Sequence, residues 1–194
     1  MRIRFGAAMP SKGGRTAVVG VEVRDARDPS GRLVHQFTVG AIERVTPFTV
    51  EAARDRVVSM MTSVADTRPC AIVDVGTPQG MALRQALVGA YSRDLHKPHA
   101  YLGGTARNFL FSAFLQAYAD GRVRFEPGLQ YRADLDRALV FYLGGGVRKD
   151  GFDLESEDEA LVVALGLAMF WPRHGAQARQ FVPAKTLDTV AAKA

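Results

Sequence analysis

The segment from Leu161 to Phe170 is apolar at nearly every position, and this restricts the fold more than any other feature of the chain. A helix with apolar residues on all sides must be covered on all sides, so we expect it to lie buried between layers of other elements. The whole apolar run, Ala160 to Trp171, is too short to cross a bilayer, which needs about 20 residues. We therefore expect a layered globular fold that does not use a membrane.

The composition excludes several classes of protein. The chain has 194 residues, of which 47% are hydrophobic, and such a content excludes a mainly disordered state. A single cysteine, Cys70, excludes an internal disulfide, and no zinc-ligand spacing joins it to the four histidines. The segment Met1–Phe5 lacks the apolar core of a signal peptide, so we expect a reducing, cytosol-like compartment. The net charge of +5 is compatible with a polyanionic partner such as nucleic acid.

Strand-type and helix-type patterns follow one another along most of the chain. Residues 1–14 are expected to be irregular or weakly extended, residues 15–173 to form one domain, and residues 174–194 to form a loose tail. The predicted strands are Thr16–Val23, Leu33–Val39, Ile42–Val45, Cys70–Val75, His99–Leu102, Val123–Phe125 and a strand or hairpin at Val147–Phe152. The predicted helices are Val50–Ala65, Gln79–Tyr91, Thr105–Tyr118, Leu135–Leu143 and Glu157–Phe170.

This order of elements, three strands followed by alternating helices and strands, is typical of an α/β fold with a mixed sheet. We expect the first three strands to be sequential neighbours in that sheet. The Cys70–Val75 strand is expected beside the first of them, Thr16–Val23, and the final helix is expected to pack on the sheet.

Acidic residues at the ends of predicted elements are the candidates for chemistry. Glu22 lies near the end of the first predicted strand, Asp74 near the end of a buried strand, and Glu155–Glu159 opens the final helix. Carboxylates that converge at strand ends can hold Mg²⁺ or Mn²⁺, and two such ions can catalyse hydrolysis of a phosphodiester. Structural interpretations stay open beside this one: Glu22 facing solvent, Asp74 capping the next turn, and Glu159 completing a capping box with Ser156.

Four stretches share their pattern with one known family. Val19–Glu22 reads hydrophobic-Gly-hydrophobic-acid, Ile72–Gly80 carries Asp74 followed by small residues, Gly121–Phe125 reads as a short Gly-Arg-hydrophobic strand, and Asp158–Ala168 opens an apolar helix with acids. Their order and spacing resemble the nuclease domain of phage terminase large subunits, over roughly residues 15–173. The resemblance implies a ribonuclease H-like fold, a mixed β-sheet flanked by helices.

The resemblance also implies an activity, a cofactor and a partner. It implies a Mg²⁺- or Mn²⁺-dependent endonuclease acting on double-stranded DNA, with Glu22, Asp74 and Glu159 as catalytic residues. The metal would be held by Glu22, Asp74, Asp158 and Glu159. Lys97, Arg107 and Lys149, in or near predicted loops, are candidate phosphate contacts. A separate packaging ATPase or portal would be a partner, in the cytoplasm of a phage-infected or prophage-bearing host.

The chain departs from the family pattern at the final helix. Glu159 stands for the first family Asp and Ala160 for the second, while Glu22 replaces the Asp of the first strand. A second hypothesis is therefore a non-catalytic DNA-binding or assembly module with the same fold. A resolvase-like nuclease is a third, because those enzymes share the arrangement of acids at strand ends.

Overall fold

The computed structural model describes residues 2–11, 13–64, 69–90, 104–143 and 157–170. Five strands form one sheet, which contains β1 (Arg2–Ala8), β2 (Thr16–Arg27), β3 (Leu33–Val45), β4 (Cys70–Val73) and β5 (Val123–Phe125). The helices are α1 (Val50–Thr62), α2 (Pro78–Ala90), α3 (Gly104–Ala119), α4 (Arg132–Leu143) and α5 (Glu157–Phe170). Among the described residues, no helix is long and apolar enough to cross a membrane.

The sheet is mixed, and its strand order is β4-β1-β2-β3-β5. The strands β1, β2 and β3 form an antiparallel meander, while β4 pairs parallel to β1 and β5 pairs parallel to β3. A parallel neighbour needs a crossover connection, and α1 supplies it between β3 and β4. The predicted class, a mixed sheet flanked by helices, is confirmed.

The first strand of the sheet is not the one that the sequence predicted. Residues 1–14 were expected to be irregular or weakly extended and to lie outside the domain, but Arg2–Ala8 forms β1 and occupies the place between β2 and β4. The β4 strand therefore pairs with β1 and not with the Thr16–Val23 strand. A second correction concerns Ile42–Val45, which continues β3 and is not a separate strand. The predicted strands at 99–102 and 147–152 and the tail at 174–194 lie outside the described residues.

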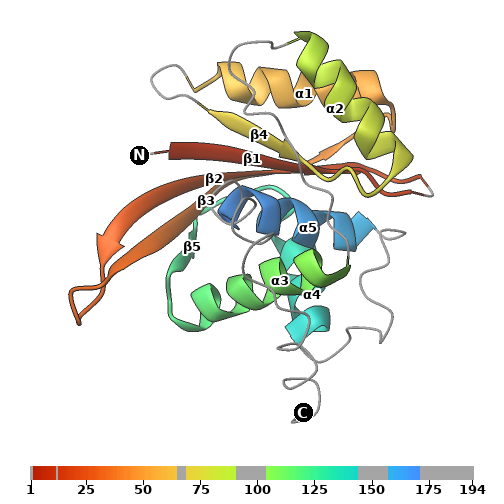
Figure 1. Ribbon diagram of the computed structural model, residues 1–194. Coiled ribbons are helices and arrows are strands. Elements are labelled where there is room, and N and C mark those ends of the chain that lie inside the picture. Colours follow the sequence, from red (N-terminus) through yellow and green to blue (C-terminus); the bar gives the residue numbers. More distant parts are fainter. Residues whose placement is uncertain (1, 12, 65–68, 91–103, 144–156, 171–194) are drawn as a thin grey trace.

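Helices cover both faces of the sheet, as Figure 1 shows, with α1 and α2 above it and α5, α3 and α4 below. Each face has its own hydrophobic core. Ala7, Val18 and Val73 face α1 and α2, whereas Ala8, Val19 and Ile72 face α5. Successive residues of a strand point to opposite faces, so the alternation in β1, β2 and β4 builds both cores at once.

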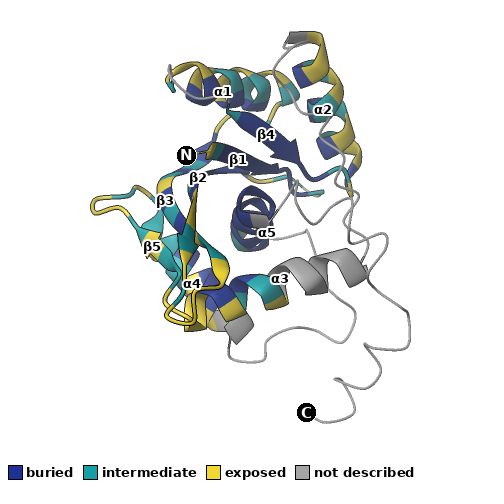
Figure 2. Ribbon diagram, turned by 60° about the vertical axis from the view of Figure 1, so that its left-hand side comes forward, coloured by how far each residue is buried: buried dark blue, intermediate teal, exposed yellow. Residues whose placement is uncertain are grey.

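The α5 helix is the buried central element that its sequence predicts. Every residue from Glu159 to Met169 whose burial is described is buried, and Figure 2 shows α5 enclosed between the sheet and α3 with α4. Gly6 lets the helix lie directly against β1, because a Cβ atom there would stand 1.9 Å from the carbonyl oxygen of Ala164. Arg4 donates a hydrogen bond of 3.0 Å to the carbonyl oxygen of Met169. The C-terminal end of α5 thus lies over the start of β1, and its first turn lies toward Ala8.

Candidate active site

Two carboxylates, Asp74 and Glu159, are buried at the same end of the sheet. Asp74 directly follows β4 and is 1% exposed, and Glu159 lies in the first turn of α5 and is 2% exposed. Cys70 and Ile72 face α5, so the alternation of β4 carries Asp74 to the same face. Because α5 runs with its first turn toward Ala8, and β4 pairs with β1 in the register Ala7 to Val73, both acids belong to the Ala8 end of the sheet.

The loop after Asp74 is tied closely to β1 and to the start of α2. The Asp74 amide donates to the carbonyl oxygen of Ala7 (2.9 Å), and the Asp74 Oδ1 atom accepts from the Gly76 amide (2.9 Å). The Thr77 hydroxyl accepts from the Gly80 amide (3.0 Å) and donates to the carbonyl oxygen of Met9 (3.2 Å). Asp74 therefore caps the turn that follows it, as one of the two interpretations predicted. The same hydrogen bond holds the Asp74 carboxyl group in place.

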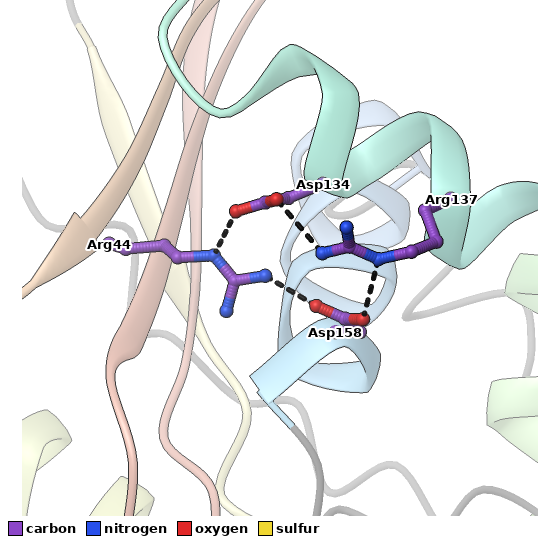
Figure 3. A network of polar contacts seen from close by, with 4 residues as sticks. All are labelled: Arg44, Asp134, Arg137 and Asp158. Carbon is purple, nitrogen blue, oxygen red and sulfur yellow. Dashed lines mark hydrogen bonds and ion pairs between the residues drawn. The ribbon is translucent and has the colours of Figure 1, made fainter.

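Asp158 belongs to an ion network and not to the site (Figure 3). Arg44 on β3, with a side chain only 1% exposed, lies 2.5 Å from Asp158 and 3.1 Å from Asp134 of α4. Arg137 of α4 contacts the same two aspartates at 3.6 Å and 2.9 Å. Two guanidinium groups already neutralise Asp158, so the structure does not support its predicted role as a metal ligand.

Glu22 lies far from Asp74, and its predicted role at this site is corrected. Its partner in β1 is Ile3, whereas Asp74 belongs to the Ala8 end of the same strand. Five residues separate those two positions, about 16 Å along a strand. The Glu22 carboxylate pairs with Arg24 and faces the side of α1. The prediction went wrong because β2 runs antiparallel to β1, so the end of β2 lies beside the start of β1.

A second match to the family's first-strand pattern lies in β1, upstream of the one predicted from the sequence. Phe5-Gly6-Ala7-Ala8 also reads hydrophobic-Gly-hydrophobic, and it lies on the strand that pairs with β4. Ala8 then stands where the family pattern has an acid. The alternation of Ile3 and Phe5 with arginines was the available signal for this strand.

The predicted phosphate contacts are not among the described side chains. Lys97 and Lys149 lie outside the described residues, as does the side chain of Arg107 in α3. Burial raises the pKa of the Cys70 thiol, which keeps it protonated and unsuited to binding a metal. In the part of the chain that the structure describes, no group of three or more His, Cys, Asp or Glu residues is arranged to hold a metal ion. The carboxylates buried at this end of the sheet are thus Asp74 and Glu159, and their oxygens are of the hard type that Mg²⁺ and Mn²⁺ prefer.

Comparison with solved structures decides the fold. The nuclease domain of the g2p large terminase of bacteriophage SPP1, solved with bound Mn, is similar with a TM-score of 0.50 and 14% identity, over 87% of this chain and 85% of that chain. This chain has the fold of a terminase nuclease domain. The human cytomegalovirus terminase nuclease domain is also similar, with a TM-score of 0.47 and 15% identity over 95% of this chain and 85% of that one. No family model and no curated protein matches the sequence.

The terminase-type fold explains the sheet of this chain. It is ribonuclease H-like, with an antiparallel meander, a parallel strand beside β1, and α5 packed across the sheet. The resemblance noted in the sequence motifs is thus confirmed at the level of the fold. The identity of 14% leaves activity to be argued from the site itself.

Proposed function

We propose that this chain is a divalent-metal-dependent DNA nuclease domain of the terminase type, with Asp74 and Glu159 as its acidic residues. The observation that carries the proposal is that the fold buries these two carboxylates at the same end of the sheet, 1% and 2% exposed. Carboxylate oxygens are the hard ligands that Mg²⁺ and Mn²⁺ prefer, so two carboxylates at one end of the sheet suit a divalent cation.

Each residue of the site has a distinct part in the proposed mechanism. A bound Mg²⁺ or Mn²⁺ ion supplies a Lewis acid for the phosphodiester. Asp74 holds its carboxyl group in a turn fixed to β1, and Glu159 presents a second carboxyl group from α5. Ala8 and Ala160 are buried where the family pattern has acids, so they add no charge. We therefore expect weak cleavage that favours Mn²⁺, in line with two carboxylates in place of a larger set.

Plasmid nicking tests this assignment. Asp74→Asn should lower the nicking rate in Mn²⁺ at least about tenfold. Removing a residue that only orients a metal ligand already costs about 10–100-fold, and removing the ligand itself should cost no less. Glu22→Gln, which removes a carboxylate from the other end of the sheet, should leave the rate within about twofold, because it does not touch the site. Ala160→Asp should raise the rate. Nicking that survives Asp74→Asn, or is abolished by Glu22→Gln, would refute the site.

A second candidate function, a non-catalytic DNA-binding or assembly module, is favoured by Ala8. A buried alanine at the end of β1 removes the acid that the family pattern places beside Asp74. For this candidate we expect no nicking by any variant and no change of melting temperature with Mn²⁺. In either case we propose double-stranded DNA as the partner, with a separate packaging ATPase or portal, in the cytoplasm of a phage-infected or prophage-bearing host.

A further inference from the structure

A cavity of about 390 Å³ opens on the face of the sheet that carries α1, opposite the face of α5. Its walls come from β1, β2, β3, the C-terminal half of α1 and the residue after β5. Its size falls within the range of about 300–1,000 Å³ that is usual for ligand pockets. All its lining residues are among those that the structure describes.

The floor of this cavity is apolar, and a glycine leaves the space that its aromatic ring occupies. Phe5 lies over Gly20, where a Cβ atom would stand 2.9 Å from the Phe5 ring and 3.2 Å from the Ala41 Cβ. A larger residue at position 20 would therefore collide with the ring. Ile3 and Met60 complete the apolar surface. Such a floor can bury an apolar side chain of a ligand.

The rim of the cavity is acidic, although the chain as a whole carries a net charge of +5. Glu22, Glu43 and Glu126 line it together with one basic residue, Arg56, and a second arginine, Arg24, lies beside Glu22. The Glu126 amide donates to the carbonyl oxygen of Val39 (3.0 Å), which holds this residue beside β3. Its carboxylate lies against Gly40, where a Cβ atom would be 3.6 Å from the Glu126 Oε2 atom.

In the ion pairs at the rim, the arginine is the exposed partner, so a ligand cation can take its place. Glu22 pairs with Arg24, whose side chain is 63% exposed, and Glu43 pairs with Arg56, whose side chain is 44% exposed. Exposed ion pairs contribute little stability, so an incoming cation can replace either arginine at small cost. A guanidinium group can also form two parallel hydrogen bonds with a carboxylate, which favours arginine in the ligand. With three glutamates against Arg24 and Arg56, the rim carries a net charge of −1, which disfavours an anion such as DNA phosphate.

We propose that this cavity is a docking site for a short segment of a partner protein that carries an arginine next to a large apolar residue. The apolar side chain would lie on Phe5 and Met60, and the arginine would pair with the glutamates of the rim. Charge complementarity selects this occupant over nucleic acid, and the proposal is independent of the nuclease site on the opposite face.

A titration of the full-length, ¹⁵N-labelled chain by NMR tests the proposal. The probe is the peptide acetyl-Gly-Leu-Arg-Gly-amide, and the matched peptides replace Arg with Glu or Leu with Gly. We expect the first peptide to shift the amides of Gly20, Gly40 and Ser63, and each matched peptide to bind at least fivefold more weakly. The double variant Glu22→Gln/Glu126→Gln should weaken the first peptide by the same factor. Glu51→Gln, an exposed acid in the first turn of α1 and away from the cavity, should not.

Several outcomes would overturn the proposal. The proposal fails if the shifted amides lie outside the cavity, if the Glu peptide binds as tightly as the Arg peptide, or if the double variant binds the Arg peptide as tightly as the original chain. It also fails if no amide shifts at a peptide concentration of about 10 mM, which would mean a Kd weaker than the millimolar range. A basic segment of the same chain, Arg179–Lys185, is the competing occupant. If Arg179→Gln/Lys185→Gln shifts the cavity amides without any peptide, the site belongs to that segment and the partner is refuted. Circular dichroism of each variant shows that the fold is retained.

Discussion

At the scale of single residues, Gly6 is the position on which the packing of α5 depends most directly. Gly6→Ala would place a Cβ atom 1.9 Å from the carbonyl oxygen of Ala164. The nearest atoms all belong to the backbone of α5, so no side-chain rotation can relieve the clash. We expect a loss of at least about 1–3 kcal/mol in the free energy of unfolding, the usual cost of overpacking. Urea denaturation measures it.

Gly89 provides the matched control for Gly6. It is exposed near the end of α2, and nothing lies within 4 Å of a Cβ atom there. Gly89→Ala should therefore stabilise the chain, by up to about 1 kcal/mol, through the higher helix propensity of alanine. The same substitution is thus expected to have opposite signs at the two positions. A Gly6→Ala variant as stable as the original chain would contradict the close contact between β1 and α5.

At the scale of elements, Arg44 joins three of them, since it extends from β3 to Asp134 of α4 and Asp158 of α5. Arg44→Met would keep the volume but leave both aspartates without their buried partner. We expect a loss of about 1–3 kcal/mol in the free energy of unfolding, below the range for a fully buried pair because the aspartates retain some contact with solvent.

Arg137→Met is the control for Arg44, since it removes a guanidinium from the same network. The Arg137 side chain is 65% exposed, so its contribution should be under about 1 kcal/mol. Thermal unfolding of the two variants side by side gives the comparison. Equal losses would mean that burial of Arg44 does not matter, and that the first turn of α5 is held by other contacts.

At the scale of the whole molecule, the net charge of +5 and the absence of a recognisable base-reading motif in the sequence predict DNA binding without sequence preference. Fluorescence anisotropy with two duplexes of equal length and different sequence should give equal affinities. The logarithm of the affinity should fall with the logarithm of salt concentration, with a slope of about −0.9 for each phosphate neutralised. Binding that ignores salt, or no binding at low salt, would contradict this prediction.

Much of the fold follows from patterns that are local in the chain. The helix α1 begins after Thr49, whose side chain accepts from the Ala52 amide at 3.1 Å, as its cap position predicts. The burial of α5 follows from apolar residues on all its sides. Asp74 became a candidate because an acid that ends so apolar a strand costs free energy unless it is used or paired, and the structure shows it accepting from the Gly76 amide.

The members of the candidate site could not be chosen in the same way. Asp158 and Glu159 are neighbours in the sequence, yet one pairs with Arg44 and the other belongs to the Ala8 end of the sheet. Position within the first turn of a helix decides which element each side chain meets, and only packing of that helix shows it. The sequence pattern identified the acidic turn but not which of its two acids pairs with Arg44 and which is buried at the end of the sheet.

Periodicity and apolar runs are local in the chain, so they were enough to predict the class of the fold and the buried final helix, and they singled out Asp74 as a candidate. Neighbours within the sheet were not predictable in this way: β1 lies between β2 and β4, Ala8 and not Glu22 stands beside Asp74, and Glu22 faces a separate cavity. The physical reason is strand register. Pairing between distant segments sets which residues become neighbours, and an antiparallel partner reverses which of its ends meets the site.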